Sequence, residues 1–155
     1  MNKMVVKALS LSAAGLISIA GYESFRSVAY QDSGGIYTVG YGTTAGVKPG
    51  HTITPEQALK TLGLTVAEFE AEIKKCLGDD LELYQHEWDA FVSLAYNIGP
   101  GAFCKSSIVT KLHMKPRPDY VGACESIKLY VKAGGRVLPG LVKRRQQEYE
   151  TCMGR

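Results

Sequence analysis

The chain of 155 residues is long enough for one domain with a substantial core, and it needs neither a metal nor a disulfide to fold. Its formal net charge of +3 is too small to choose between a cell wall, an acidic membrane and nucleic acid as a partner. No zinc-finger, phosphate-loop or GxGxxG spacing occurs, so none of these three motif classes is indicated.

The amino-terminal segment is apolar and contains two early basic residues. Lys3 and Lys7 precede fifteen uncharged residues, 8–22, a pattern typical of an export signal. As a helix this run is roughly 22 Å long, short of a ~30 Å hydrocarbon core, and including residues 4–6 gives about 28 Å. Its Gly, Ala and Ser residues weaken its preference for the membrane further. The segment is therefore a marginal span that could enter a membrane and later leave it.

Three interpretations of this segment compete: the first amphipathic helix of a cytosolic domain, a cleaved signal peptide, and an uncleaved, releasable anchor. Residues 18–20 do offer small side chains at the spacing that signal peptidase needs. Cleavage there would leave Glu23 as the third residue of the mature chain, on a frayed terminus. We therefore favour the releasable anchor for residues 1–22, followed by a catalytic domain over residues 20–155.

A short β-hairpin is predicted between Ser27 and Thr43. This stretch contains β-forming residues interrupted by Asp32-Ser33-Gly34-Gly35, a turn signal between two runs.

The remainder of the chain is predicted to be helical. Thr54-Pro55-Glu56-Gln57 combines an N-cap, a proline at the first helical position and a capping box, and residues 65–68 repeat the box. Two helices, 55–62 and 66–77, should follow with Gly63 between them. A core helix over 86–98 places Trp88 and other apolar residues at helical spacing and stops at Gly99-Pro100-Gly101. Later helices are expected at 107–114, at 119–133 with Asp119 as cap and Gly134-Gly135 as stop, and at 140–152.

Two carboxylates belong to the region of the predicted hairpin: Glu23 precedes the hairpin, and Asp32 lies in its turn. Hydrolysis of a glycoside needs one protonated carboxyl and one ionised carboxylate, so the pair must lie in different environments. Glu23 ends an apolar segment, which favours the protonated acid, whereas Asp32 lies in a Gly-rich polar turn, which favours the ionised form. On this chemistry alone, the favoured interpretation of both residues is that they are solvated surface groups or turn caps.

The pattern Glu23-x8-Asp32-x5-Thr38, followed by Gly40-x-Gly42, resembles the catalytic region of the phage-type lysozymes, glycoside hydrolase family 24. Residues 88–103 resemble the core helix and cleft wall of that family, and residues 133–150 its carboxy-terminal helical corner. The resemblance spans about residues 20 to 152. It implies an α+β, lysozyme-like fold that is mainly helical, with a small amino-terminal antiparallel sheet and a catalytic cleft.

The resemblance also implies roles for individual residues. Glu23 would protonate the glycosidic oxygen between N-acetylmuramic acid and N-acetylglucosamine, while Asp32 and Thr38 would hold the attacking water. That mechanism inverts the anomeric carbon and needs carboxyls roughly 6.5–9.5 Å apart. Where the family often has His after the second glycine, this chain has Thr43. Residues expected to line the glycan cleft are Thr44, Tyr96, Asn97 and Ser107, for which core packing (Tyr96) or capping (Asn97, Ser107) is the alternative.

A cluster of cations, Lys143, Arg144 and Arg145, allows two interpretations. They could contact anionic wall polymers or help to place Glu23, but we favour a solvated helix face in which Arg144 pairs with Glu148 at the i,i+4 spacing. The three histidines, His51, His86 and His113, show no metal-ligand spacing, and no metal or other cofactor is implied.

The four cysteines lie outside the anchor and the catalytic motif, and an even number in an exported protein indicates disulfides with three alternative connectivities. We predict Cys76–Cys104, which brackets the core helix, and Cys124–Cys152, which joins two consecutive terminal helices. Four free thiols are the alternative, favoured if the protein is cytosolic.

The function expected from the resemblance is that of an endolysin, a muramidase that acts on peptidoglycan for host cell lysis. The expected partners are peptidoglycan and, transiently through residues 4–22, the inner membrane, but no nucleic acid, and the protein should be a monomer. It should be tethered to the host inner membrane facing the periplasm and then released into the periplasm. The alternatives are a lytic transglycosylase on the same bond, against which Asp32 and Thr38 argue, and an inert, membrane-tethered wall-binding module.

Overall fold

Helices make up most of the chain, and the strands form three separate two-stranded antiparallel sheets. The computed structural model describes residues 1–155. The helices are α1 (Ala13–Tyr22), α2 (Pro55–Leu77), α3 (Gln85–Ile98), α4 (Pro100–Cys104), α5 (Ser107–Leu112), α6 (Tyr120–Ser126) and α7 (Pro139–Cys152). The strands are β1 (Met4–Val5), β2 (Arg26–Gln31), β3 (Tyr37–Gly40), β4 (Glu82–Leu83), β5 (Lys132–Ala133) and β6 (Arg136–Val137), with 3-10 turns at Val6–Ala8 and Ile127–Leu129. This arrangement confirms the predicted α+β class, mainly helical with small antiparallel sheets.

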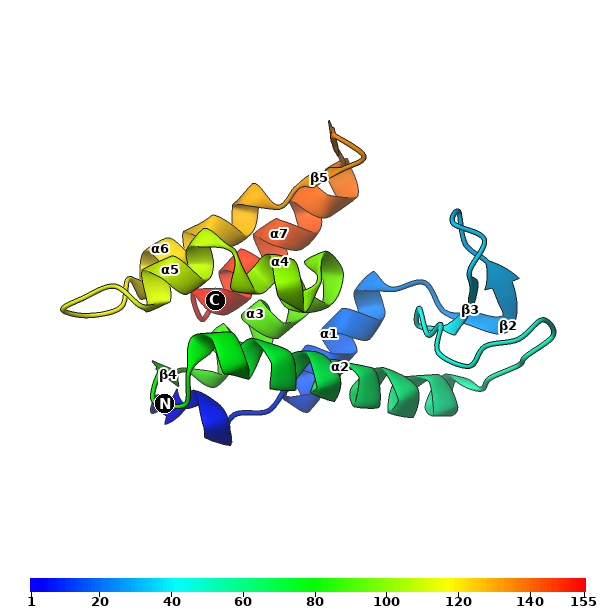
Figure 1. Ribbon diagram of the computed structural model, residues 1–155, viewed down its shortest axis with the longest axis horizontal. Coiled ribbons are helices and arrows are strands. Elements are labelled where there is room, and N and C mark those ends of the chain that lie inside the picture. The colour runs from blue at the N-terminus through cyan, green and yellow to red at the C-terminus, as the bar shows by residue number, and fades with distance from the viewer.

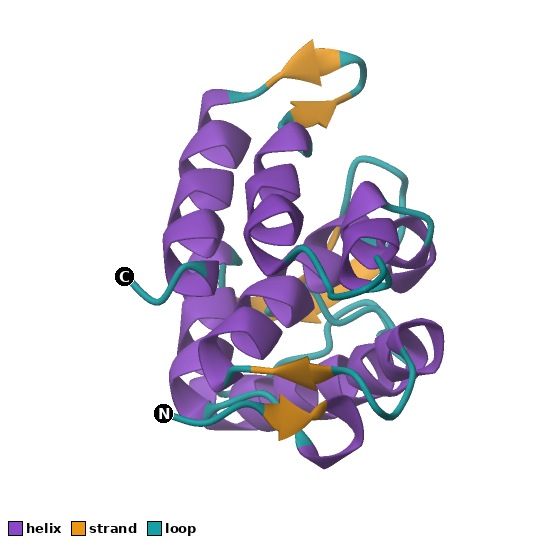
Figure 2. Ribbon diagram, turned by 90° about the vertical axis from the view of Figure 1, so that its left-hand side faces the viewer, coloured by secondary structure: helices purple, strands orange, loops and turns teal.

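Helix α3 is the centre of the hydrophobic core, as its apolar spacing predicted. It packs against α1, α2, α4 and α7 (Figures 1 and 2), and both Trp88 and Phe91 are fully buried. The indole N–H of Trp88 donates to Glu70 Oε2 at 2.8 Å, so that the polar atom of this buried ring is satisfied.

The predicted hairpin forms from β2 and β3, with Tyr30 opposite Thr38. Asp32 builds its turn, because one carboxylate oxygen, Oδ1, accepts the backbone N–H groups of Gly34 (2.8 Å) and Ile36 (2.9 Å). Gly35 follows with a φ of 78°, which a side chain would strain. The hairpin lies beyond the carboxyl end of α1, away from α5 and α6 (Figure 1).

Residues 55–77 form one helix, so the prediction of two helices separated at Gly63 was wrong. The Thr54 capping box is present, but Thr65 lies inside the helix, where its hydroxyl donates to the Thr61 carbonyl at 3.1 Å. A helical glycine costs only about 1 kcal/mol relative to alanine, and burial of Leu62 and Val66 on either side of it outweighs that cost.

The predicted helix over 119–133 is also shorter than expected. Asp119 caps α6 as predicted, since its Oδ1 accepts the N–H of Gly122 at 2.9 Å, but the helical turns end at Leu129. Gly134 and Gly135 have φ values of 57° and 78° and form the turn of the β5–β6 hairpin, instead of stopping a helix. Similarly, Gly99 ends α3, but Pro100 then begins the unpredicted helix α4.

The amino-terminal segment folds into the domain in three pieces. Strand β1 pairs with β4, a 3-10 turn follows, and α1 begins only at Ala13, so the expected helix over 8–22 is shorter than predicted. Val6 and Leu9, ahead of the helix, are fully buried in the core. None of the helices combines the length and apolar character that a membrane span requires.

Both predicted disulfides are present. Cys76–Cys104 joins the ends of α2 and α4, and Cys124–Cys152 joins α6 to α7, each closing a sequence separation of 28 residues. No free cysteine remains, so the alternative of four thiols is wrong.

Candidate active site

Glu23 is the first residue after α1, and its position is fixed from the backbone outward. Its N–H donates to the Ile19 carbonyl at 3.2 Å, which closes the last turn of the helix, while its φ and ψ of −90° and 141° turn the chain towards β2. The side chain is 26% exposed. The helix therefore presents this carboxylate at the junction with the hairpin.

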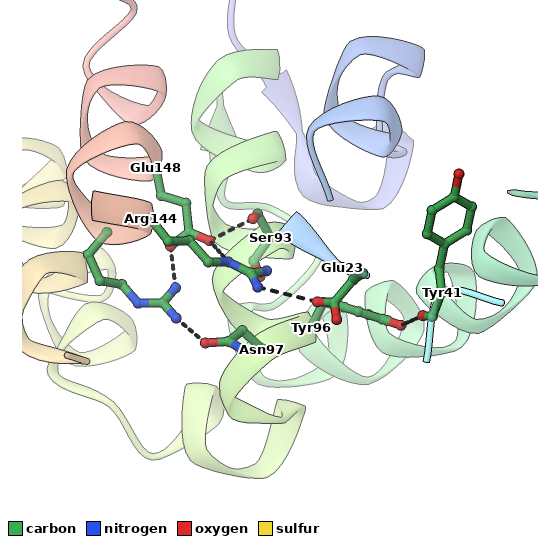
Figure 3. Close-up of polar contacts among 8 residues, drawn as sticks. Glu23, Tyr41, Ser93, Tyr96, Asn97, Arg144 and Glu148 are labelled. Carbon is green, nitrogen blue, oxygen red and sulfur yellow. Dashed lines mark hydrogen bonds and ion pairs between the residues drawn. The ribbon is translucent and has the colours of Figure 1, made fainter. Parts of the chain in front are cut away.

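The closest charged partner of Glu23 comes from the other end of the chain. Arg144 on α7 donates from Nη1 to Glu23 Oε1 at 3.3 Å (Figure 3), and its side chain is only 7% exposed. The sequence predicted an apolar surrounding for Glu23, and this proved incomplete, because a buried cation faces the carboxylate. The candidate acid therefore lies directly beside a buried cation.

The prediction of a solvated cationic helix face was wrong for two of its three members. Lys143 is exposed, but Arg144 and Arg145 are buried where α7 packs against α3. The predicted i,i+4 pair does form, with Arg144 Nε 3.0 Å from Glu148 Oε1. The less favoured interpretation, that these cations help to place Glu23, agrees with the Arg144 contact.

Tyr96 on α3 lies next to Glu23 (Figure 3). Its hydroxyl donates to the Tyr41 carbonyl at 3.2 Å, which connects the core helix to the loop after β3. Burial, together with the negative charge of Glu23, raises the pKa of Tyr96 to about 12, against an opposing effect of Arg144. Tyr96 is therefore a neutral hydroxyl beside the candidate acid at any physiological pH.

Asp32 and Thr38 lie on the hairpin, in surroundings unlike those of Glu23. Asp32 uses Oδ1 for the two turn N–H groups described above, and no cation pairs with it. Thr38 is 5% exposed, and its hydroxyl donates to the Ile36 carbonyl at 3.2 Å. The turn thus fixes the orientation of one carboxylate, while a buried cation holds the other.

The four residues predicted to line a glycan cleft divide into two pairs. Tyr96 and Asn97 belong to the polar network around Glu23. Tyr96 lies beside the Glu23 carboxylate and donates to the Tyr41 carbonyl, and Asn97 Oδ1 accepts a hydrogen bond from Arg145. Thr44 is an exposed loop residue, and Ser107 is an exposed residue at the start of α5. Neither has a side-chain hydrogen bond to that network.

Three members of this network were not identified from the sequence as site residues: Tyr41, Ser93 and Glu148. Ser93 precedes Tyr96 and Asn97 by three and four positions, so helical spacing already placed all three on one face of α3. For Glu148, the spacing predicted its pairing with Arg144, but no sequence signal predicted that the pair would be buried.

The structure holds no group of three or more His, Cys, Asp or Glu side chains placed to bind a metal ion.

The chain as a whole is similar to several known proteins. A family model described as Phage lysozyme matches residues 20–148. An endolysin of Acyrthosiphon pisum secondary endosymbiont phage 1 is 39% identical over 144 residues, which cover 90% of this chain and 95% of the relative. A SAR-endolysin of bacteriophage PS34 is 31% identical over 134 residues, which cover 86% of this chain and 77% of the relative. The structure of an endolysin from Escherichia coli O157:H7 phage FAHEc1 is 33% identical, with a TM-score of 0.81 and 94% of each chain covered.

Proposed function

Because this chain belongs to the phage lysozyme family, we propose that it is an endolysin that hydrolyses the β-1,4 bond between N-acetylmuramic acid and N-acetylglucosamine for host cell lysis. At the coarser level, family membership makes it an enzyme that degrades peptidoglycan. The observation that carries the finer proposal is the placement of Glu23, whose backbone closes α1 and whose carboxylate meets the buried Arg144 at 3.3 Å. Because its backbone is fixed at the junction of α1 and the hairpin, Glu23 can offer a proton at a defined position.

In the proposed reaction, Glu23 gives its proton to the glycosidic oxygen as the bond from that oxygen to the anomeric carbon breaks. A water held by Asp32 and Thr38 attacks the anomeric carbon from the opposite face and gives a proton to Asp32. The outcome is inversion, which requires carboxyls about 6.5–9.5 Å apart. Asp32 is suited to act as base because its turn fixes one oxygen and no cation neutralises it.

We place the glycan strand across the same region, with Tyr96 and Asn97 as contacts near the reacting bond and Thr44 and Ser107 as outer contacts. Tyr96 is a neutral hydroxyl beside Glu23, so it can hydrogen-bond sugar hydroxyls without adding charge near the proton donor. Thr44 and Ser107 are exposed, as contacts to a long polymer must be.

Turbidity clearing on purified peptidoglycan tests this function. Glu23→Gln keeps the shape of the side chain but removes its transferable proton, and loss of general acid catalysis should lower the rate ~10²–10⁴-fold. Glu56→Gln is the matched control, because Glu56 is an exposed carboxylate on α2. A folded Glu23→Gln protein that clears walls at more than about a tenth of the wild-type rate would overturn the assignment. Products with anhydro-muramic ends would instead favour a lytic transglycosylase.

We also propose that residues 4–22 act first as an uncleaved membrane anchor and then as part of the folded enzyme. Support comes from the marginal apolar run and from relatives named SAR-endolysin, including that of phage PS34. While the segment spans the host inner membrane, Glu23 would be held at the bilayer face, away from Arg144. Release into the periplasm would let α1 dock and bring the two together.

A further inference from the structure

Glu148 is the most deeply buried carboxylate of the polar network behind Glu23. Its side chain is 2% exposed, and it accepts three hydrogen bonds. Oε1 receives the Ser93 hydroxyl at 2.6 Å and Arg144 Nε at 3.0 Å, while Oε2 receives Arg145 Nη1. One buried anion therefore lies between two buried cations (Figure 3), although Glu148 does not contact Glu23.

These contacts determine which N–H groups of the Arg144 guanidinium can donate to Glu23. Nε of Arg144 faces Glu148, and Nη2 donates to the Ser93 carbonyl at 3.2 Å. The guanidinium also lies 4.4 Å from the centre of the Tyr22 ring. Only Nη1 reaches Glu23, through a single contact at 3.3 Å, so a two-pronged ion pair between Arg144 and Glu23 is prevented.

The charges of the buried cluster also limit the attraction between Arg144 and Glu23. Arg144, Arg145 and Glu148 together carry one net positive charge, which an ionised Glu23 neutralises. Without the charge of Glu148, Arg144 would have Glu23 as its only carboxylate partner, and this pairing would favour the ionised form of Glu23. An ionised Glu23 has no proton to donate.

We infer that Glu148 is a positioning residue: it holds Arg144 so that only Nη1 reaches Glu23, and it offsets part of the charge that Arg144 presents to the candidate acid. This inference rests on the proposed function, in which Glu23 is the general acid. Other titratable groups around the cluster are two tyrosines, whose pKa values are raised mainly by burial and which therefore stay neutral in this range: Tyr22 of α1 and Tyr96 of α3.

The test is the pH–activity profile of Glu148→Gln on purified peptidoglycan. Because Gln keeps the shape but removes the charge, the basic side of the profile should move to lower pH by roughly one unit. Activity on the acidic side of the profile should stay close to that of wild type. Glu150→Gln is the matched control, because it removes the same charge from an exposed position of α7 and should leave the profile in place.

A folded Glu148→Gln protein that is slower by the same factor at every pH would overturn the inference, since that is the effect of a purely structural role. If this variant does not fold, the double variant Glu148→Gln/Arg145→Gln replaces it, because removing both members of a buried ion pair costs much less than removing one. Its basic side should still move to lower pH, and a profile at the wild-type position would equally overturn the inference. Failure of the proposed function is recognised separately, by an active Glu23→Gln variant.

Discussion

The hydroxyl of Ser12 donates to Asp89 Oδ2 at 2.5 Å, and the Ser12 N–H donates to Asp89 Oδ1 at 3.0 Å. Ser12 also caps α1, since its Oγ accepts the N–H of Gly15 at 3.0 Å. One end of α1 is thus fixed to the core helix, while the other end carries Glu23 to Arg144. The same helix is the proposed membrane anchor, so variants that test anchoring must leave this docking intact.

Leucines at Ser18 and Gly21 should delay release from the membrane without harming the folded enzyme. Both positions are exposed on α1, and a Cβ at Gly21 would meet nothing within 4 Å. Each leucine should strengthen membrane insertion by roughly 1.5–3 kcal/mol. Cell fractionation after induction measures release, and Ser18→Thr/Gly21→Ala serves as the control. Release as fast as that of wild type, or a chain that starts at Gly21, would contradict the anchor.

Gly15→Leu should give a different result, namely loss of activity even in released protein. A Cβ at Gly15 would lie 2.6 Å from Leu11 Cδ1 and 3.0 Å from Asp89 Cγ. Although Leu11 can move aside, Asp89 is held by Ser12, so a side chain as large as leucine pushes α1 away from α3. Peptidoglycan clearing by purified, released protein measures this effect. Normal activity of that protein would show that α1 docks less tightly than these distances require.

Arg144→Met should destabilise the fold by roughly 3–5 kcal/mol, because it leaves Glu148 buried with one cation instead of two. Lys143→Met is the control on the same helix, and it should change the free energy of unfolding by about 0.5 kcal/mol or less, since Lys143 is exposed and forms no salt bridge. Denaturant unfolding of the two variants measures the difference. Equal stabilities would mean that the buried network contributes little.

The two disulfides should differ in accessibility but not greatly in their effect on stability. Each closes a separation of 28 residues, so removing either pair should cost roughly 3–4 kcal/mol. Cys124 and Cys152 are fully buried, whereas Cys76 and Cys104 are partly exposed, so the latter pair should be reduced first. Alkylation during mild reduction, followed by peptide mapping, gives the order. Earlier labelling of Cys124 and Cys152 would disagree with this prediction.

Tyr96 should make the fold sensitive to alkaline pH. Its pKa in the folded state is raised to about 12 by burial and by the charge of Glu23, above the unfolded value of about 10. Its contribution is therefore fully present below pH ~10 and is lost as the pH rises towards about 12. Unfolding of wild type and Tyr96→Phe over this range measures the effect. The stability of wild type should fall more steeply than that of the variant.

Local features of the fold could be predicted from the sequence because short-range physics determines them. The Asp32 turn, the Thr54 capping box and the Asp119 cap each depend on hydrogen bonds within four residues, and all three are present. The apolar spacing around Trp88 likewise predicted the core helix. Predictions failed where packing outweighs a local preference, as at Gly63, which lies inside α2 because its neighbours are buried.

For the site, the available groups can be identified without a structure: Glu23 before a hairpin, Asp32 in its turn, and Arg144 four residues before Glu148. The contact between Arg144 and Glu23, 121 residues apart, and the burial of Glu148 behind it become visible only in the folded chain. The physical reason is that an i,i+4 ion pair looks the same in sequence on a solvated and on a buried helix face. Which face is covered depends on the packing of α7 against α3, and that burial turns a weak surface pair into a strong constraint on the candidate acid.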